Sequence, residues 1–420
     1  MRGLARLLCA VLLAGGLAAC SGDGGEGGAA TAGPGTLDVW VMRDSAPDDL
    51  IERVNAEVEA AHPGLTVRVQ VLDWEGRDVK WKTALAGDDP PDVLEMGNTD
   101  VLTYAASGAL AELKPADYEN SGTWLKGLAD AGGYEGKLYG VPYYGGTRVV
   151  IYRKDLFEKA GIDSEPATLA ELRQAAEKLM KANPGEDFSG LYFPGRYQYG
   201  ALPFVFDAGG QIAAKEGTAW KGMLSTPQSQ QGLRNWADLV KAVSKAPLDV
   251  DTDADRFVDA LGQGHTGMII GQAWMMRGLG EKYPKLADQL GAFPVPGVNG
   301  TMPVFIGGSN LVVSAGSQAP AIATEWVKLI TGTKYQTELA RSGLLPNSTS
   351  LEGVVEGVTA VQMKAAARSW FTPQSTQWSN VDNAQVLQDM FQAIASGEKS
   401  VAEAAATADK KIAEILNATG

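Results

Sequence analysis

Aromatic rings and planar polar groups stand where several predicted strands end. Arg43 and Asp44 follow the apolar run LDVWVM, Trp74 ends the run LTVRVQVLDW, and Trp274 follows GMIIGQA. Indole rings can stack on the C–H face of a polyhydroxy ligand, while guanidinium and carboxylate groups can pair two hydroxyls at once. These residues suit such a ligand, although Arg43 and Asp44 could equally form a solvated ion pair and Trp74 could cap the nearby helix.

Three further polar side chains follow the short strand predicted at 93–96. Asn98, Thr99 and Asp100 come directly after it and before a predicted helix. Amide and carboxylate groups have the shape to pair two hydroxyls. The same residue types are also the favoured helix caps, so a ligand-binding role and a capping role both remain open.

The elements that must position these residues alternate between the period of a strand and the period of a helix. Residues 37–42 read as a strand, the run LIERVNAEVEAAHPG reads as a helix that stops at Pro63-Gly64, and 65–74 reads as a second strand. Such α/β alternation predicts a largely parallel sheet with helices on its faces. In open α/β sheets ligands bind outside the carboxyl ends of the strands, where the polar residues above are found.

Later segments continue the alternation of predicted strands and helices. Thr168, with Glu171 three residues on, predicts a capping box at a helix start. Further helices are predicted near 228–243, near 320–330 and within the Ala-rich segment 383–416, and GGSNLVVS reads as a strand.

The first residues have the pattern of an export signal. Arg2 and Arg6 precede an apolar run over 7–13, and small residues lead to Cys20. This run is much shorter than the roughly 20 residues of a membrane-spanning helix, so an exported protein is expected rather than an integral membrane protein. The sequence Leu-Ala-Ala before Cys20 resembles the lipobox of bacterial lipoproteins.

That resemblance implies a signal peptide over 1–19 and a lipid on Cys20. A plain secreted protein cleaved near Ala19 is the alternative. Residues 20–36 are rich in Gly, Ala and Ser, which predicts a flexible tether. A lipid on such a tether would hold the folded part near the membrane surface.

Composition excludes several kinds of partner and site. The chain has 36 Lys and Arg against 50 Asp and Glu, a formal net charge of −14, so no nucleic acid partner is expected, because nucleic acid is bound through basic patches. His62 and His265 are far apart in the sequence, Cys9 would leave with the leader, and Cys20 would carry the lipid. No metal site, cofactor, disulfide or catalytic triad is therefore expected.

The roughly 385 residues after the tether exceed what one hydrophobic core usually serves, so two domains are expected. Several motifs along them fall in a recognisable order. They are HPGLTVRVQV, LAGDDPPDVLEMGNTD, ASGALAEL, GKLYGVPYY, VVIYRKDLFEKAGI followed by TLAELRQAAEKL, GMIIGQAW, GGSNLVVS and LPNSTSL. Together they resemble the carbohydrate-binding solute-binding lipoproteins of ABC importers, of the maltose-binding-protein-like kind, over nearly the whole mature chain.

The resemblance implies an α/β, two-lobed periplasmic-binding-protein-like fold with a hinge and a ligand cleft between the lobes. It implies a first lobe over 37–139 plus 307–345 and a second lobe over 140–306 plus 346–420. The chain would cross between the lobes near Val141-Pro142 and near Ile306-Gly307. Gly307 and Gly308 could absorb the change of backbone angles on closure, or could merely permit tight packing.

Several site residues are implied only by the resemblance. Tyr143 and Arg148 are expected to face the cleft, with Tyr144 sent to the opposite side by strand alternation. Tyr199 and Trp274 match aromatic platforms by their local sequence.

Near the C-terminus, Trp378 matches a further platform of the family. After the glycines of the second crossing, Ser309 could offer donors to a hydroxyl. The full predicted ligand-binding set is Arg43, Asp44, Trp74, Asn98, Thr99, Asp100, Tyr143, Arg148, Tyr199, Trp274, Gly307, Gly308, Ser309 and Trp378.

The function implied is that of the extracytoplasmic binding component of an ABC sugar importer. Such a protein would capture a mono- or oligosaccharide by hinge closure, act as a monomer, deliver the sugar to the transmembrane permease subunits and catalyse no reaction. A secreted glycoside hydrolase is one alternative, but it needs two carboxyls at a defined separation and no motif nominates a pair. The same fold binding a polyamine or another non-sugar solute is a second alternative.

Overall fold

The computed structural model describes residues 35–252 and 254–418. The predicted signal peptide 1–19, the lipidation site Cys20 and most of the tether lie outside these residues. Within the described ranges, no helix combines the length and apolar character needed to cross a membrane.

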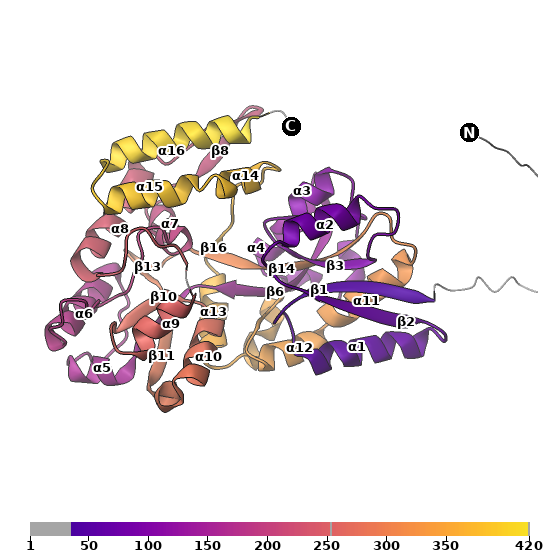
Figure 1. The fold of residues 1–420 in the computed structure, drawn as a ribbon, viewed down its shortest axis with the longest axis horizontal. Helices are drawn as coiled ribbons and strands as arrows, with labels where there is room; N and C mark the ends of the chain where they lie inside the picture. Colours follow the sequence, from indigo (N-terminus) through magenta and orange to yellow (C-terminus); the bar gives the residue numbers. More distant parts are fainter. Residues whose placement is uncertain (1–34, 253, 419–420) are drawn as a thin grey trace, which may run out of the picture. The chain divides into compact units, whose positions relative to one another are not determined.

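A seven-stranded mixed sheet organises the first part of the fold (Figure 1). Its order is β15-β6-β14-β3-β1-β2, with β16 paired to the start of β14. The three N-terminal strands are parallel, whereas β14, β6 and β15 add antiparallel neighbours. The strands are β1 (Thr36–Met42), β2 (Thr66–Leu72), β3 (Val93–Gly97), β6 (Gly140–Thr147), β14 (Val304–Val313), β15 (Leu345–Pro346) and β16 (Ser369–Trp370).

Helices cover both faces of this sheet, because alternate residues of each strand point to opposite sides. Val39 and Val93 join a core cluster with α1 and α11, whereas Leu94 and Met96 join another with Trp81 of α2. Figure 1 accordingly shows α1 and α12 on one side of the sheet and α2 and α3 on the other. The helices are α1 (Asp48–Ala61), α2 (Arg77–Leu85), α3 (Val101–Ala106), α4 (Lys126–Ala131), α11 (Pro320–Thr331) and α12 (Thr333–Arg341).

Strand β2 forms an edge of the sheet. At its centre Arg68 makes two hydrogen bonds to the Asp38 carboxylate of β1, at 2.7 and 2.5 Å. The pair sits at matched positions of the two parallel strands. It therefore ties the edge strand to its neighbour through side chains as well as backbone.

A second, smaller sheet runs β10-β7-β11 and is antiparallel throughout. Its strands are β7 (Val149–Arg153), β10 (Met268–Gly271) and β11 (Leu290–Pro294). The helices near it are α5 (Lys154–Lys159), α6 (Leu169–Ala182), α7 (Gln198–Asp207), α8 (Pro227–Val243), α9 (Ala254–Gly262), α10 (Ala273–Lys282), α13 (Gly357–Ala366), α14 (Trp378–Asn383), α15 (Val386–Ala395) and α16 (Val401–Leu416). Short two-stranded hairpins complete the fold: β4 (Gly133–Tyr134) with β5 (Lys137–Leu138), β8 (Ala213–Glu216) with β9 (Ala219–Gly222), and β12 (Pro296–Gly297) with β13 (Gly300–Thr301).

The prediction of a largely parallel sheet is wrong. It rested on consecutive strand–helix–strand units, which describe β1, β2 and β3 well. Such local units give no information on strands from distant parts of the chain, and these strands run antiparallel to their neighbours. The predicted capping box is confirmed: the Thr168 hydroxyl accepts from the Glu171 backbone amide at 3.2 Å, and the Glu171 carboxylate accepts from the Thr168 amide at 3.2 Å.

The hydrophobic residues divide into separate clusters, which we use to name two lobes. The first lobe is built around the clusters that contain Leu37 and Trp81, and the second lobe around the large cluster that runs from Val149 to Leu416. A smaller cluster that includes Ile306 and Leu345 lies apart from these. The sheet strands β6 and β14 pair with each other where the chain passes between the lobes. Val141 and Tyr143 belong to the cluster that contains Leu37. The division of the chain into a first lobe over 37–139 plus 307–345 and a second lobe over 140–306 plus 346–420 stays a prediction.

Candidate functional site

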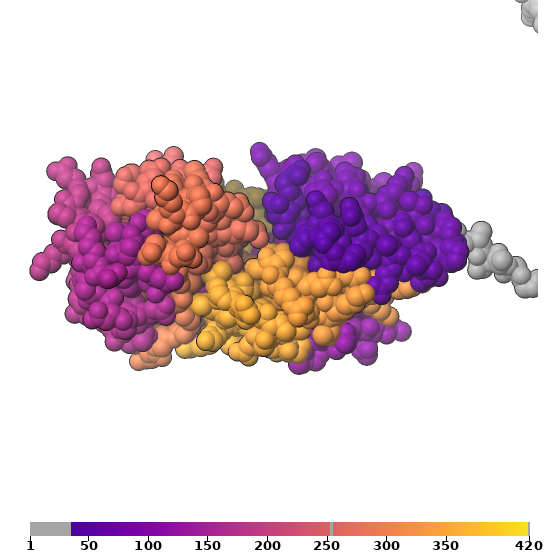
Figure 2. Space-filling view, turned by 90° about the horizontal axis from the view of Figure 1, so that it is seen from below, coloured from indigo at the N-terminus to yellow at the C-terminus, as the bar shows by residue number. Residues whose placement is uncertain are grey.

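A central cavity of about 870 Å³ is lined by residues of both lobes. In the space-filling view, a recess separates the indigo N-terminal segments from the salmon segments near residue 270 (Figure 2). The first lobe contributes Arg43, Asp44, Trp74, Arg77, Asn98, Thr99 and Asp100; the second contributes Tyr199, Gln272, Trp274, Arg277, Glu281 and Phe305; and Tyr144, Gly145, Gly146, Gly307 and Gly308 come from the crossing strands.

The first-lobe wall is built on an arginine held between two indoles. The Arg77 guanidinium carbon lies 5.5 Å from the ring centroid of Trp74 and 5.6 Å from that of Trp81. One of its terminal nitrogens donates to the Trp74 carbonyl at 3.0 Å, and the other to the Asp100 carboxylate at 3.4 Å. Because one cation contacts both Trp74 and Asp100, the aromatic platform and the carboxylate are positioned together.

The polar residues after β3 line the same wall. Asn98 is buried, and its side-chain amide donates to the Ile306 carbonyl at 3.1 Å, linking β3 to the crossing strand β14. Burial raises the pKa of the Asp100 carboxyl to about 6, with Arg77 opposing that shift. Arg43 lies at the rim and pairs with Asp73 at 2.6 Å rather than with Asp44.

The second-lobe wall carries two aromatic rings. Trp274 stands in the first turn of α10 with 40% of its surface exposed, and its indole N–H donates to the Gln272 side chain at 2.5 Å. Tyr199, at the start of α7, stacks on Phe305 with ring centroids 4.6 Å apart. These are the two rings on which the sequence prediction depended most, and both line the central cavity.

Arg148 was expected to face the cleft, and this prediction is wrong. The side chain is buried and does not line the cavity. Its guanidinium lies 4.9 Å from the Tyr199 ring centroid, and its Nε donates to the Tyr197 hydroxyl at 2.7 Å. The reason is that the rings of Tyr197, Tyr199 and Phe305 provide a cation–π environment inside the second lobe, so Arg148 supports Tyr199 from behind.

The choice of Tyr143 over Tyr144 is also wrong. Tyr143 is fully buried in the core of the first lobe, whereas Tyr144 lines the cavity. The two rings meet edge to face with centroids 5.3 Å apart. The two side chains do point to opposite faces of β6, as strand alternation requires. Helices packed on β6 determine which face is buried, and the sequence prediction chose the wrong face for the cleft.

Two further predicted residues lie outside the cavity. Ser309 has no exposed surface, because its position in β14 pairs with Gly97 on one side and Tyr144 on the other. Trp378 is only 4% exposed and packs in the second-lobe core, since the first turn of α14 turns its indole inward. Gly307 and Gly308 do line the cavity.

Several cavity residues were missed by the sequence analysis, and helical spacing could have found two of them. Arg277 and Glu281 follow Trp274 at three and seven positions on α10, so they share its face. Arg77 opens α2 three residues after Trp74, which lies before the helix, so helical spacing does not connect these two. Tyr144, Gln272 and Phe305 carry no such periodic signal.

A buried carboxyl lies among the strands that form the cavity floor. Glu95 of β3 is fully buried, and one of its carboxylate oxygens accepts from the Met42 backbone amide at 2.8 Å. Burial raises the pKa of Glu95 to about 7, although the Met42 amide and the hydroxyls of Ser309 and Ser45 oppose the shift. This group therefore titrates near neutral pH while remaining out of contact with solvent.

The site thus offers indole and phenol faces, carboxylates, amides and guanidinium groups around one cavity. Among residues 35–252 and 254–418, no group of three or more His, Cys, Asp or Glu side chains is arranged to hold a metal ion. Aromatic faces with convergent hydrogen-bonding groups are suited to reversible binding of a ligand that has both apolar faces and polar edges.

Comparisons with known proteins agree with this geometry. The model of the bacterial extracellular solute-binding protein family matches residues 44–337. The diacetylchitobiose binding protein DasA of Streptomyces coelicolor is 32% identical over 390 residues, which cover 90% of this chain and 91% of DasA.

Solved structures give the same result for the fold. The GacH receptor of Streptomyces glaucescens, solved unliganded and in complex with acarbose, is similar with a TM-score of 0.76 at 25% identity, covering 92% of this chain and 99% of GacH. The sugar-binding protein MalE of Xanthomonas citri gives a TM-score of 0.80 at 23% identity, covering 91% of this chain and 97% of MalE. The predicted two-lobed periplasmic-binding-protein-like fold is confirmed.

Proposed function

The chain belongs to the bacterial extracellular solute-binding protein family, and we propose that its solute is a saccharide, which it delivers to the transmembrane subunits of an ABC importer. The observation that carries this proposal is the pair of indoles, Trp74 and Trp274, that line one cavity from different lobes. Carboxylate, amide and guanidinium groups between them match the hydroxyl rim of a sugar. The relatives are named for binding diacetylchitobiose or sugars, or were solved with acarbose, which supports the same solute class.

Capture would proceed by closure of the lobes. A saccharide first contacts one wall, and contacts made to the second wall only in the closed state shift the population toward closure. Gly307 and Gly308 lie in the crossing strand β14 and line the cavity, which supports a hinge role there. We propose that no chemical step is involved, and that the closed form is what the permease recognises.

The proposed location rests on the leader predicted from the sequence. We propose that Cys20 is lipidated and that the Gly- and Ala-rich segment after it tethers a monomeric binding domain to the outer face of the cell membrane. Mass spectrometry of the membrane fraction tests this proposal. The added mass of a lipid is expected on the wild-type protein and not on a Cys20→Ser variant.

Calorimetric titration of the purified domain with mono- and oligosaccharides tests the solute class. Micromolar or tighter binding to at least one saccharide is expected. A thermal-shift screen that sets sugars against polyamines discriminates the alternative solute, because a ligand that binds only the native state raises the midpoint. The saccharides should be recovered unchanged after incubation, and cleavage products would instead favour a glycoside hydrolase.

Removing the indole of Trp274 is expected to weaken saccharide binding. Truncation of a buried aromatic contact commonly costs about 2 kcal/mol, which corresponds to about thirtyfold in Kd. Trp274 is partly exposed, so Trp274→Ala should leave folding intact. Calorimetry with the best saccharide of the panel measures the change.

Two matched variants control this experiment. Trp274→Phe keeps an aromatic face and is expected to retain most of the affinity. Lys282→Ala alters the same helix at a residue that pairs with Asp259 and does not line the cavity, so it should bind like wild type. Equal affinities for Trp274→Ala and Lys282→Ala would remove Trp274 from the site.

A further inference from the structure

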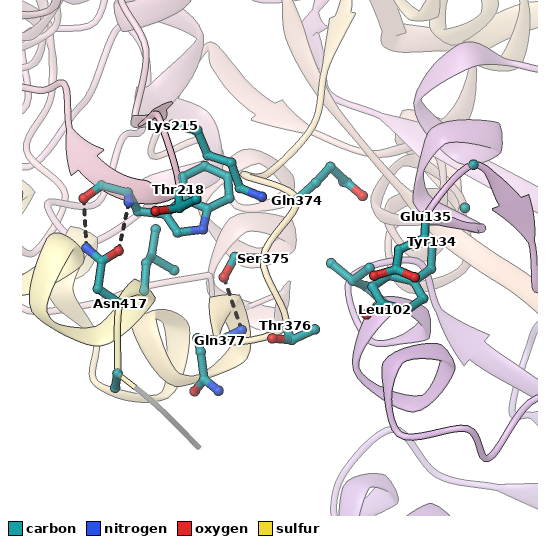
Figure 3. Close-up of a pocket in the computed structure, with 15 residues that line it drawn as sticks. Leu102, Tyr134, Glu135, Lys215, Thr218, Gln374, Ser375, Thr376, Gln377 and Asn417 are labelled. Atoms are coloured by element: carbon teal, nitrogen blue, oxygen red, sulfur yellow. Dashed lines mark hydrogen bonds between the residues drawn. The ribbon is translucent and has the colours of Figure 1, made fainter.

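A second space, which we call the outer pocket, has a volume of about 770 Å³ and is also lined by both lobes (Figure 3). On the first-lobe side are Leu102 of α3 and the β4–β5 turn with Tyr134 and Glu135. On the other side are the β8–β9 hairpin, the loop 374–377 and the end of α16. Figure 3 shows these two groups of side chains facing one another across open space.

The outer pocket contains an aromatic ring that is held in place. Trp220 of β9 is half-buried against the second-lobe core. The Asn417 side chain accepts from the Trp220 backbone amide at 2.7 Å and donates to its carbonyl at 2.8 Å (Figure 3). Lys215 places its ammonium 5.3 Å from the ring centroid, on an exposed and adaptable side chain. The backbone at Trp220 is therefore anchored and its ring packs against the second-lobe core, while the cation over the ring can turn toward a ligand oxygen.

The remaining polar groups of the pocket are mostly neutral. Hydroxyl and amide groups come from Thr218, Ser375, Gln374 and Gln377. Lys215 and Glu135 are the charged side chains in the lining, one of each sign. This composition does not favour a polyanion or a polycation. An indole face surrounded by hydroxyls and amides is instead suited to a neutral polyhydroxy chain.

The outer pocket lies next to the central cavity along the chain. Thr99 and Asp100 line the central cavity, and Leu102, two residues later, lines the outer pocket. Beside them the Thr103 hydroxyl donates to the Thr376 carbonyl at 3.4 Å, a long hydrogen bond between the lobes. On the first-lobe side, the two spaces are therefore lined by residues that lie close together at the start of α3.

We propose that the outer pocket is a second saccharide subsite, which receives the distal rings of an oligosaccharide whose other rings occupy the central cavity. The solute would then be an oligosaccharide rather than a single sugar ring. This rests on the proposed function and specifies its substrate class. Trp220 provides the stacking face, and the surrounding amides and hydroxyls bind the ring edges.

The test compares ligand length with a variant that fills the outer pocket. Maltooligosaccharides and chitooligosaccharides, each from the disaccharide to the hexasaccharide, are titrated calorimetrically into the complete folded domain. In wild type, affinity is expected to rise about tenfold once the ligand is long enough to reach Trp220. Thr218→Trp places an indole in the pocket from an exposed hairpin turn, so it should abolish this rise and leave the disaccharide affinity unchanged.

Ala219→Trp is the matched control, because Ala219 is exposed on the same hairpin and does not line the pocket. It is expected to keep the length dependence of wild type. Trp220→Ala, with its fold checked by circular dichroism, should lose that dependence as Thr218→Trp does. If short saccharides bind but affinity does not increase with length, or if the increase survives in Thr218→Trp, the second subsite is excluded while the proposed function stands. If no saccharide binds wild type, the proposed function fails and the subsite with it.

Discussion

The Gly308→Ala variant is expected to lose about 3 kcal/mol or more of its free energy of unfolding. Gly308 has a φ of +148°, and a Cβ built on it would lie 2.2 Å from the Tyr144 carbonyl oxygen and 2.9 Å from the Gly145 Cα. Both are backbone atoms of β6, which cannot rotate away as a side chain would. Either β6 or β14 must shift where the two strands pair. Urea denaturation of the purified domain measures the loss.

The loss in Gly308→Ala can come from backbone strain at a positive φ or from the contact of the new Cβ with β6, and Gly300→Ala distinguishes the two. Gly300 also has a positive φ, +110°, but an added Cβ there would have no atom within 4 Å. Only backbone strain remains, for which about 1 kcal/mol is expected. Similar losses in the two variants would show that the contact with β6 contributes nothing. A larger loss at 308 would show that β6 and β14 are closely packed where the proposed closure would bend them.

Replacing Glu95 with Gln is expected to stabilise the protein at pH 8 by about 3 kcal/mol and to have little effect at low pH. The folded-state pKa of Glu95 is raised to about 7 by burial, above its ordinary value of 4.5. Between these values the unfolded chain has lost the proton that the folded chain still holds. The free energy of unfolding of wild type therefore falls as the pH rises from about 4.5 to about 7, and stays lower above it.

The amide introduced by Glu95→Gln would keep an acceptor for the Met42 amide and would not ionise, so this loss should disappear in the variant. Urea titrations at pH 5 and pH 8 measure the difference between the two proteins. Glu352→Gln, at an exposed position, is the control and should follow wild type at both pH values. Parallel pH dependence in wild type and Glu95→Gln would show that the carboxyl is already ionised in the folded protein.

Part of the site was predictable because strand ends are a local feature. Arg43, Trp74 and Asn98 follow the strands β1, β2 and β3, whose parallel pairing brings their carboxyl ends to one edge of the sheet. All three line the central cavity. Trp274 follows β10 in the same way, from the other lobe. Whether these residues bind ligand stays a prediction, but their convergence follows from the strand positions alone.

Orientation within an element was less predictable, because distant contacts determine it. Tyr143 and Tyr144 differ only in which face of β6 they occupy, and that face is chosen by packing with segments much later in the chain. Arg148 is turned inward by rings from α7 and β14. The antiparallel pairing of β14 with β3 and β6 likewise joins residues far apart in the sequence, so no local pattern contains it.

Strand β2 is at the edge of the sheet, where the Glu59 carboxylate accepts from the Val67 amide at 2.8 Å. An edge strand of this kind can recruit a strand from a neighbouring molecule and nucleate aggregation. The ion pair of Arg68 with Asp38 stands beside that edge. A docking strand would have to strip water from these charges, which is costly unless it brings compensating groups. The pair that ties β2 to its own sheet therefore also discourages intermolecular strand addition when copies crowd together.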